Sequence, residues 1–166
     1  MKIARVTLSD RAAAGVYPDA SGPEIERLVG EHFAPPLEWT RVLLPDDRAA
    51  LEAALRRLAD GEQCPLILTT GGTGPSARDV TPEATRAVLE KELPGFGEIM
   101  RLQSYAKVRT SILSRATAGV RGRSLIINLP GRPAAVAECL PLLVPAIAEA
   151  IEHLAGFRPA LRLPGS

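Results

Sequence analysis

The sequence predicts a three-layer α-β-α sandwich with a mostly parallel central sheet and a small antiparallel hairpin near the C-terminal third. Three apolar stretches, 3–8, 37–44 and 66–69, have the composition of strands, and two segments with helical spacing separate them. Strands that alternate with helices form parallel sheets with right-handed crossovers. Further along, Ala116–Val120 and Ser124–Leu129 flank a short Arg-Gly-Arg turn, which is the spacing of a hairpin.

Two helices connect the first three strands. The first covers about 22–33, where Ser21 and Glu24 have the spacing of a capping box. The second begins after Asp46, which can act as its N-cap, and ends at Gly61. We expect these strands in the order 2-1-3, with their carboxyl ends along one edge of the sheet.

Three more helices follow the third strand. Thr81–Pro82 has the pattern of an N-cap followed by a first-turn proline, and another helix begins near Pro94. The last segment, 133–154, has apolar residues at helical spacing. Pro141 and Pro145 should kink or split this helix, because proline lacks the backbone donor that a helix interior needs.

Composition restricts the class of protein. The 166 residues are 46% hydrophobic and 23% charged with a formal net charge of +1, so we expect one domain over 1–166, with 155–166 as a loose tail. The balanced charge gives no bulk attraction to nucleic acid or to an anionic membrane. Cys64 and Cys139 match neither a zinc site nor a disulfide framework, and the apolar N-terminus is too short for a signal peptide or a membrane span. We expect a cytoplasmic protein with no nucleic-acid or membrane partner.

A glycine-rich stretch follows the third strand. Gly71, Gly72 and Gly74 lie within four residues, where the carboxyl end of a buried parallel strand is expected. Glycine permits positive φ and lets backbone N–H groups approach a ligand, and the helix that opens at Thr81 adds N–H groups that favour anions. A tight turn without a ligand is the alternative. We interpret the stretch as a phosphate cradle, although it matches neither a Walker loop nor a dinucleotide fingerprint.

Taken together, Thr69–Pro75 and Arg78–Thr85 resemble the molybdopterin adenylyltransferases. Other segments match the same family in the same order: Ser9–Arg11 with Gly15 and Asp19, Leu44–Asp46, Pro94–Glu98 with Met100 and Arg101, and Asn128–Gly131 with Pro133. The resemblance covers about 2–155. Ser76–Ala77 lies in the variable part of the loop, and the chain lacks an insertion that some bacterial members carry before the last helix.

The resemblance implies a reaction and an assembly. The family transfers AMP from Mg-ATP to molybdopterin, giving adenylylated molybdopterin and pyrophosphate, so ATP is a substrate and Mg²⁺ a cofactor. Members assemble as homotrimers. A partner enzyme then inserts molybdate, which allows a transient contact with that insertion enzyme.

Two aspartates are candidates for catalysis and for binding Mg²⁺. Nucleotidyl transfer brings two anions together, so metal and backbone donors carry most of the catalysis and no covalent nucleophile is needed. Asp79 follows the glycine loop directly, where a carboxylate can hold Mg²⁺ against phosphates, or alternatively can order the loop. Asp46 lies at the same predicted edge, and the resemblance favours a functional role for it beside its possible role as a helix cap.

The remaining candidates bind substrates. Those expected to bind nucleotide or phosphate are Thr70, Gly71, Gly72, Thr73, Gly74, Asn128, Pro130 and Gly131. Those expected to bind substrate elsewhere are Ser9, Asp10, Arg11, Arg78 and Glu98. Structural alternatives exist for several: turn stabilisation for Asn128, solvation for the arginines, and helix capping for Glu98.

Other functions compete with the enzyme. A catalytically silent molybdopterin-binding paralogue would bind without turning over ATP, but the retention of Asp46, Asp79 and every loop glycine argues against it. A molybdenum-insertion module or a scaffold domain fused to receptor-clustering machinery normally carries additional domains, for which 166 residues leave no room. We therefore expect an adenylyltransferase.

Overall fold

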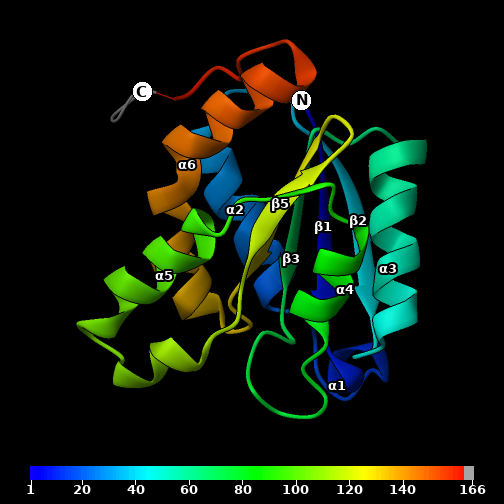
Figure 1. Ribbon diagram of the computed structural model, residues 1–166, viewed down its shortest axis with the longest axis vertical. Coiled ribbons are helices and arrows are strands. Elements are labelled where there is room, and N and C mark those ends of the chain that lie inside the picture. The colour runs from blue at the N-terminus through cyan, green and yellow to red at the C-terminus, as the bar shows by residue number, and fades with distance from the viewer. Residues whose placement is uncertain (163–166) are drawn as a thin grey trace.

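The computed structural model describes residues 1–162, and a six-stranded sheet forms its middle layer (Figure 1). The strands are β1 (Lys2–Leu8), β2 (Glu38–Leu44), β3 (Leu66–Thr70), β4 (Lys91–Glu92), β5 (Ala118–Arg121) and β6 (Ser124–Leu129). Their order in the sheet is β2-β1-β3-β6-β5-β4. Strands β1, β2, β3 and β6 are parallel, whereas β5 runs antiparallel to both β4 and β6. The predicted 2-1-3 order and the predicted hairpin are confirmed.

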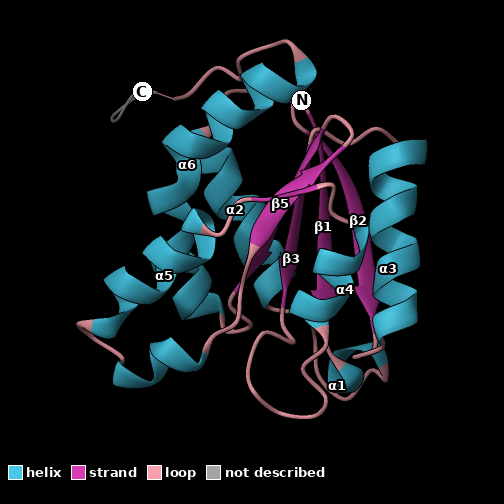
Figure 2. Ribbon diagram, viewed as in Figure 1, coloured by secondary structure: helices cyan, strands magenta, loops and turns pink. Residues whose placement is uncertain are grey.

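Helices cover both faces of this sheet (Figure 2). One face carries α2 (Ser21–His32), α5 (Gly95–Tyr105) and α6 (Pro133–Ala155), and the other carries α3 (Arg48–Arg56) and α4 (Thr81–Val88). The shorter elements are α1 (Asp10–Ala13), the π-helical turn η1 (Arg57–Gly61) and the 3-10 segment η2 (Arg109–Leu113). The predicted three layers are confirmed.

The core consists of one apolar cluster on each face of the sheet. Ile67 and Ile126 contribute to the cluster under α3 and α4, while their neighbours Leu68 and Ile127 contribute to the cluster under α2, α5 and α6. All four side chains are fully buried. Successive strand residues point to opposite faces, so a strand covered on both faces must be apolar throughout.

The last helix runs without a break through both of its internal prolines. Pro145 is exposed and Pro141 is half-buried, so the positions that lose a backbone donor lie on the less buried side of α6. The predicted split is therefore wrong. By length and composition α6 resembles a membrane span, but its stripe of Val136, Leu140 and Ile147 is buried in the core cluster.

The chain after α6 is held against the molecule. The backbone of 160–162 pairs with that of 32–34 through two hydrogen bonds of 2.8 Å and one antiparallel bridge. The predicted loose tail over 155–166 is therefore wrong for 160–162, because this stretch finds backbone partners at the end of α2. Residues 163–166 of that prediction lie outside the described residues.

The carboxyl ends of the four parallel strands lie along one edge of the sheet, at the bottom in Figure 1. This edge brings together 9–11 after β1, 45–46 after β2, 71–79 after β3 and 130–132 after β6. Segments that are far apart in the sequence therefore meet at one place, as the parallel topology requires.

Candidate functional site

The glycine loop, defined here as residues 71–79, turns sharply as it leaves β3. Gly71 and Gly72 have φ angles of 93° and 64°, which L side chains rarely adopt. A Cβ at Gly71 would overlap the carbonyl oxygen of Leu8, and a Cβ at Gly72 would lie 2.5 Å from Thr81 Oγ1. Glycine is required at both positions because β1 and α4 approach the loop so closely.

Thr81 and Ser21 are expected to cap helices, but they bond the glycine loop and the 130–132 turn instead. Thr81 Oγ1 donates to the carbonyl oxygen of Gly71 at 2.8 Å, and Thr81 N donates to that of Gly72 at 3.0 Å. Ser21 Oγ donates to the carbonyl oxygen of Gly131 at 2.6 Å. Neither α4 nor α2 has a side-chain hydrogen bond at its N-cap. The predicted caps are wrong because both hydroxyls have tertiary partners.

Asp46 and Asp10 link the ends of β2 and β1. Asp10 N donates to Asp46 Oδ2 at 3.1 Å, and Asp46 N donates to Asp10 Oδ1 at 2.9 Å. The N-cap of α3 is Asp47, which accepts a hydrogen bond of 2.7 Å from Ala50 N. The predicted capping role of Asp46 is therefore wrong. Its Oδ1 faces the glycine loop instead, 3.4 Å from a Cβ built at Gly72.

Negative charge accumulates beside the loop. Burial raises the pKa of Asp46, and the charges of Asp10 and Asp79 add to this rise, whereas Arg78 opposes it. The backbone N–H of Asp46 lowers the pKa of Asp10, and so does Arg78, which forms an ion pair with Asp10. The charges of Asp10 and Asp79 both act on Asp46, and a bound cation would relieve this repulsion.

Asp79 closes the loop on itself and keeps one oxygen available. Its Oδ2 accepts a hydrogen bond of 2.9 Å from Ser76 N, and its own N–H donates to the carbonyl oxygen of Ser76 at 3.0 Å. Within residues 1–162, Asp79 Oδ1 has no hydrogen-bond partner. Ordering the loop uses Oδ2, so Oδ1 would be available for the metal that the sequence predicts at Asp79.

The carboxylates fit a magnesium ion that arrives with phosphate. Mg²⁺ usually takes one or two carboxylates and completes its shell with phosphate oxygens and water. In the part of the chain that the structure describes, Asp46 Oδ1 and Asp79 Oδ1 are both without a hydrogen-bond partner. No group of three or more His, Cys, Asp or Glu in that part is arranged to hold a metal ion. The protein alone would therefore supply only part of the shell.

Arg115 grips the outer half of the loop, and the sequence did not single it out. Its backbone N donates to the carbonyl oxygen of Thr73 at 2.8 Å. Its guanidinium donates to the carbonyl oxygens of Gly74 and Asp79 at 2.9 and 2.8 Å and pairs with Glu83. An isolated arginine before a short strand carries no motif, so only the folded chain reveals this contact.

Asn128 is buried away from the loop. It is fully inaccessible, its Nδ2 donates to Thr69 Oγ1 at 3.0 Å and to Thr85 Oγ1 at 2.9 Å, and its Oδ1 accepts from Thr117 N at 3.4 Å. The side chain ties β6 to β3 and α4. These bonds favour a structural role that joins strands and helix rather than the turn stabilisation considered above, and the nucleotide contact of Asn128 stays a prediction.

Three of the other predicted residues, Thr70, Ser9 and Arg11, have partners within the protein at the carboxyl edge. Thr70 Oγ1 donates to the carbonyl oxygen of Pro130 at 2.6 Å, so the end of β3 and the 130–132 turn are joined. Ser9 caps α1 by accepting from Ala12 N at 3.2 Å, and the Arg11 guanidinium lies 4.9 Å from the centre of the Tyr17 ring.

Glu98 has no direct bond to the glycine loop. It is exposed in the first turn of α5 and, among the described residues, has no hydrogen bond or ion pair to the glycine loop. Its predicted contact with substrate stays a prediction.

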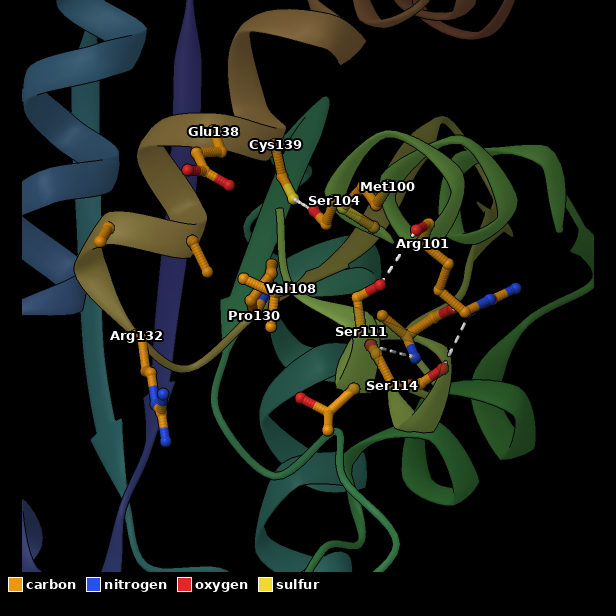
Figure 3. A pocket seen from close by; sticks show the side chains of 14 residues that line it. Met100, Arg101, Ser104, Val108, Ser111, Ser114, Pro130, Arg132, Glu138 and Cys139 are labelled. Atoms are coloured by element: carbon orange, nitrogen blue, oxygen red, sulfur yellow. Dashed lines mark hydrogen bonds between the residues drawn. The ribbon is translucent and has the colours of Figure 1, made fainter. Parts of the chain in front are cut away.

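Two cavities flank the 130–132 turn. The β1 cavity has a volume of about 320 Å³ and lies between the end of β1, residues 17–21 and Gly71. The α5–α6 cavity, of about 250 Å³, lies between α5, η2 and the first turns of α6 (Figure 3). Arg132 lines both. Their volumes are near the lower end of ligand pockets, roughly 300–1,000 Å³, so each suits one part of a larger substrate.

The α5–α6 cavity combines apolar walls with hydroxyl groups. Met100 and Val108 line it together with Ser104, Ser111 and Ser114 (Figure 3). Such a lining, mostly apolar with a few polar groups that fix orientation, is typical of small-molecule sites. Ser114 and Ala116, the neighbours of Arg115 in the chain, also line this cavity, so it lies beside the segment that bonds the glycine loop.

Comparison with known proteins identifies the family and the relatives that this chain resembles. A family described as a probable molybdopterin binding domain matches residues 4–149. The chain is 48% identical to the molybdopterin adenylyltransferase of Helicobacter pylori J99 over 151 residues, which cover 91% of this chain and 86% of that protein. It is 47% identical to the Escherichia coli K12 enzyme of the same name over 140 residues, covering 84% and 72%.

The fold has solved counterparts. The crystal structure of the molybdopterin biosynthesis enzyme MoaB from Thermus thermophilus superposes with a TM-score of 0.86 at 39% identity, over 95% of this chain and 98% of that one. A structure of MogA superposes with a TM-score of 0.80, also at 39% identity, over 93% and 99%.

Proposed function

The chain belongs to the molybdopterin-binding domain family, as its motifs predicted, and we propose that it is a molybdopterin adenylyltransferase of molybdenum cofactor biosynthesis. One observation carries the proposal: a glycine loop meets two aspartates at the carboxyl edge of the sheet in a chain 48% identical to enzymes of that name. The silent paralogue is not favoured, because the relatives that match most of the chain are named as enzymes.

The reaction joins two anions. An oxygen of the molybdopterin phosphate forms a bond to the α-phosphorus of ATP, the bond from that phosphorus to the bridging oxygen breaks, and pyrophosphate leaves with the electron pair. The barrier is mostly repulsion and alignment. We assign the phosphates to the backbone N–H groups of Gly71–Gly74, because positive φ angles and the adjoining N-terminus of α4 favour anions there.

Asp79 and Asp46 are the residues we assign to Mg²⁺. Each has a carboxylate oxygen that no group in the described chain occupies, and Asp46 lies where like charges already crowd. When bound, the metal neutralises charge on the phosphates. Asp46 must be ionised for this role, and its raised pKa means that ionisation is complete only at a higher pH than for an ordinary aspartate.

The two cavities offer room for two substrates. They lie on either side of the 130–132 turn, and Arg132 faces both. We expect molybdopterin and ATP to occupy one each, with their phosphates meeting at the glycine loop. Ser9, Asp10, Arg11 and Arg78 stay predicted substrate contacts, as do the loop residue Thr73 and the turn residues Pro130 and Gly131.

Incubation with molybdopterin and Mg-ATP tests the function. We expect adenylylated molybdopterin and pyrophosphate in equal amounts, and no product when Mg²⁺ is replaced by a chelator. Tight binding of molybdopterin without either product would identify a silent paralogue instead.

We expect the enzyme to act as a homotrimer in the cytoplasm, in transient contact with the molybdate-insertion enzyme. Several large apolar side chains are exposed along α5, η2 and the turn between them: Leu102, Tyr105, Val108, Ile112 and Leu113. Apolar patches of this kind commonly mark association surfaces. Light scattering should give three times the 17.6 kDa of one chain, and a monomer at micromolar concentration would contradict the trimer.

A further inference from the structure

The outer half of the glycine loop, residues 73–79, has few bonds to the rest of the protein. Across the described chain, its hydrogen bonds and ion pairs to other segments involve two arginines. One is Arg115, which reaches the loop from the segment before β5. The other is the loop's own Arg78, which pairs with Asp10. The position of Asp79 therefore depends on very few tethers.

These two tethers differ in strength. The side chains of Arg78 and Asp10 are 68% and 42% exposed, and ion pairs at such surfaces contribute little to stability. The Arg115 side chain is 35% exposed and makes charge-assisted hydrogen bonds to two loop carbonyl groups, in addition to its backbone bond. Arg115 is accordingly the main tether.

The shape of the guanidinium suits this task. Its Nε donates to Gly74 O near one end of the outer loop and its Nη2 to Asp79 O at the other end, while Nη1 pairs with Glu83 in the first turn of α4. A planar fork with fixed donor directions sets the spacing between the two carbonyl groups, which the point charge of a lysine cannot do.

Burial alone would raise the pKa of Glu83, but the hydrogen bond and charge of Arg115 outweigh it, so the pKa is lowered. Glu83 is thus ionised at neutral pH and anchors the fork to α4. Each of the three guanidinium nitrogens of Arg115 has a partner within the protein, so three of its five N–H donors are engaged in holding the loop and α4.

We propose that Arg115 is a positioning residue for adenylyl transfer: it fixes the outer glycine loop so that the Asp79 carboxylate faces the reacting phosphates. The proposal rests on the proposed function for its reaction. Its structural half, the restraint of residues 73–79, can be measured without any turnover.

The chain provides a matched control at the other end of the same strand. Arg121 also has a partner for each of its three guanidinium nitrogens, with Nε and Nη2 donating to Asp60 and Nη1 donating to the carbonyl oxygen of Val88 at 2.9 Å. Its side chain is 19% exposed, so it is buried at least as well as that of Arg115. Replacing it removes the same charge and a similar set of bonds at the opposite edge of the sheet.

The kinetic test compares Arg115→Gln, Arg115→Lys and Arg121→Gln below the melting temperature of all three. We expect Arg115→Gln to lower kcat about 10²-fold, as a misplacement near 1 Å does, with the KM for molybdopterin changed less than about threefold. Arg115→Lys should recover little of the loss, and Arg121→Gln should keep kcat within about twofold of wild type. Equal kcat values for the two Gln variants, or full recovery with Lys, would overturn the proposal.

Amide hydrogen exchange tests the restraint itself. Exchange of residues 73–80 should rise at least about tenfold in Arg115→Gln and stay at the wild-type rate in Arg121→Gln. Unchanged exchange in Arg115→Gln would overturn the proposal even if kcat fell. If the wild type makes no product, the proposed function fails separately, and with it the catalytic half of this proposal, while exchange still decides whether Arg115 holds the loop.

Discussion

The two edges of the central sheet contain the same kinds of residue but pack them differently. At the carboxyl edge, the positive-φ glycines Gly71 and Gly72 lie against Leu8 and Thr81. At the opposite edge, Gly122 also has a positive φ, of 54°, in the turn between β5 and β6, but a Cβ built there meets nothing within 4 Å. All three glycines therefore form turns, but only the turn at Gly71 and Gly72 is packed tightly against other segments, as a binding site requires.

The carboxylates of the two edges differ in the same way. Asp60, at the opposite edge, has Arg121 to itself, and the hydrogen bonds of this pair lower its pKa. Asp46 is half-buried near Asp10 and Asp79, and burial together with these two charges raises its pKa, while Arg78 opposes the rise. The Asp60–Arg121 ion pair is neutral on its own, whereas the carboxylates around Asp46 carry excess negative charge that a bound cation can neutralise.

Replacing one aspartate at each edge should give the largest difference in the rate of adenylyl transfer. Asp79→Asn keeps an oxygen that can accept from Ser76 N, so the loop should keep its shape while the charge that we assign to Mg²⁺ is lost. We expect adenylyl transfer to fall ~10³-fold with no change in the circular dichroism spectrum. Asp60→Asn should leave the rate unchanged, since Asp60 faces only Arg121 at the far edge. Wild-type turnover by the Asp79 variant would refute its assignment.

A methyl group added at each edge should also separate the two. Gly71→Ala forces a strained φ and a collision with the Leu8 carbonyl group, and should cost about 3 kcal/mol or more in the free energy of unfolding. Gly122→Ala has the strained φ alone, in open space, and should cost about 1 kcal/mol. Denaturant titration measures both values, and equal costs would show that the close approach of β1 to the loop is not rigid.

Much of the fold was predictable because its signals are local. Apolar strands separated by helical spacing gave the parallel sheet, and the Arg-Gly-Arg turn gave the hairpin. The two-residue strand β4 was missed because it is too short to carry a pattern. The convergence of Asp46, Asp79 and the loop glycines was also predictable, since parallel strands share one carboxyl edge.

The contacts at the site that the sequence did not predict all join residues distant in the sequence. Ser21 has the spacing of a helix cap but bonds a carbonyl group 110 residues away. Arg115 bonds loop residues 36 and 41 positions before it. The burial of Asn128 depends on α4, which covers it. Residue type and spacing carry no information about such contacts, so the arrangement that shapes the loop appears only in the folded chain.

Asp46→Asn should reveal a conflict between stability and function. A raised pKa in the folded state means that ionisation of Asp46 opposes folding: its favourable contribution is present at low pH and is lost as pH rises through the folded pKa. The neutral variant keeps an acceptor for Asp10 N and avoids this loss. We expect a higher Tm than wild type at pH 7, no difference well below the ordinary value of 3.8, and a loss of adenylyl transfer. A lower Tm at pH 7 would mean that the Asp46 charge is already balanced by the protein.

Asp10→Asn should produce the smallest change, a displacement of the acid limb of kcat/KM. The charge of Asp10 contributes to the raised pKa of Asp46, though less than burial does, and its removal also frees Arg78 to favour ionised Asp46. The Asp10 backbone N–H still donates to Asp46 in this variant, so the hydrogen bond that opposes the rise persists. The pKa of Asp46 should therefore fall, and activity should persist to lower pH than in wild type. Asp47→Asn is the control, because asparagine also caps a helix and Asp47 is not among the groups that shift Asp46. If both variants moved the limb equally, or if the Asp10 variant moved it to higher pH, a group other than Asp46 would set the acid limit of the reaction.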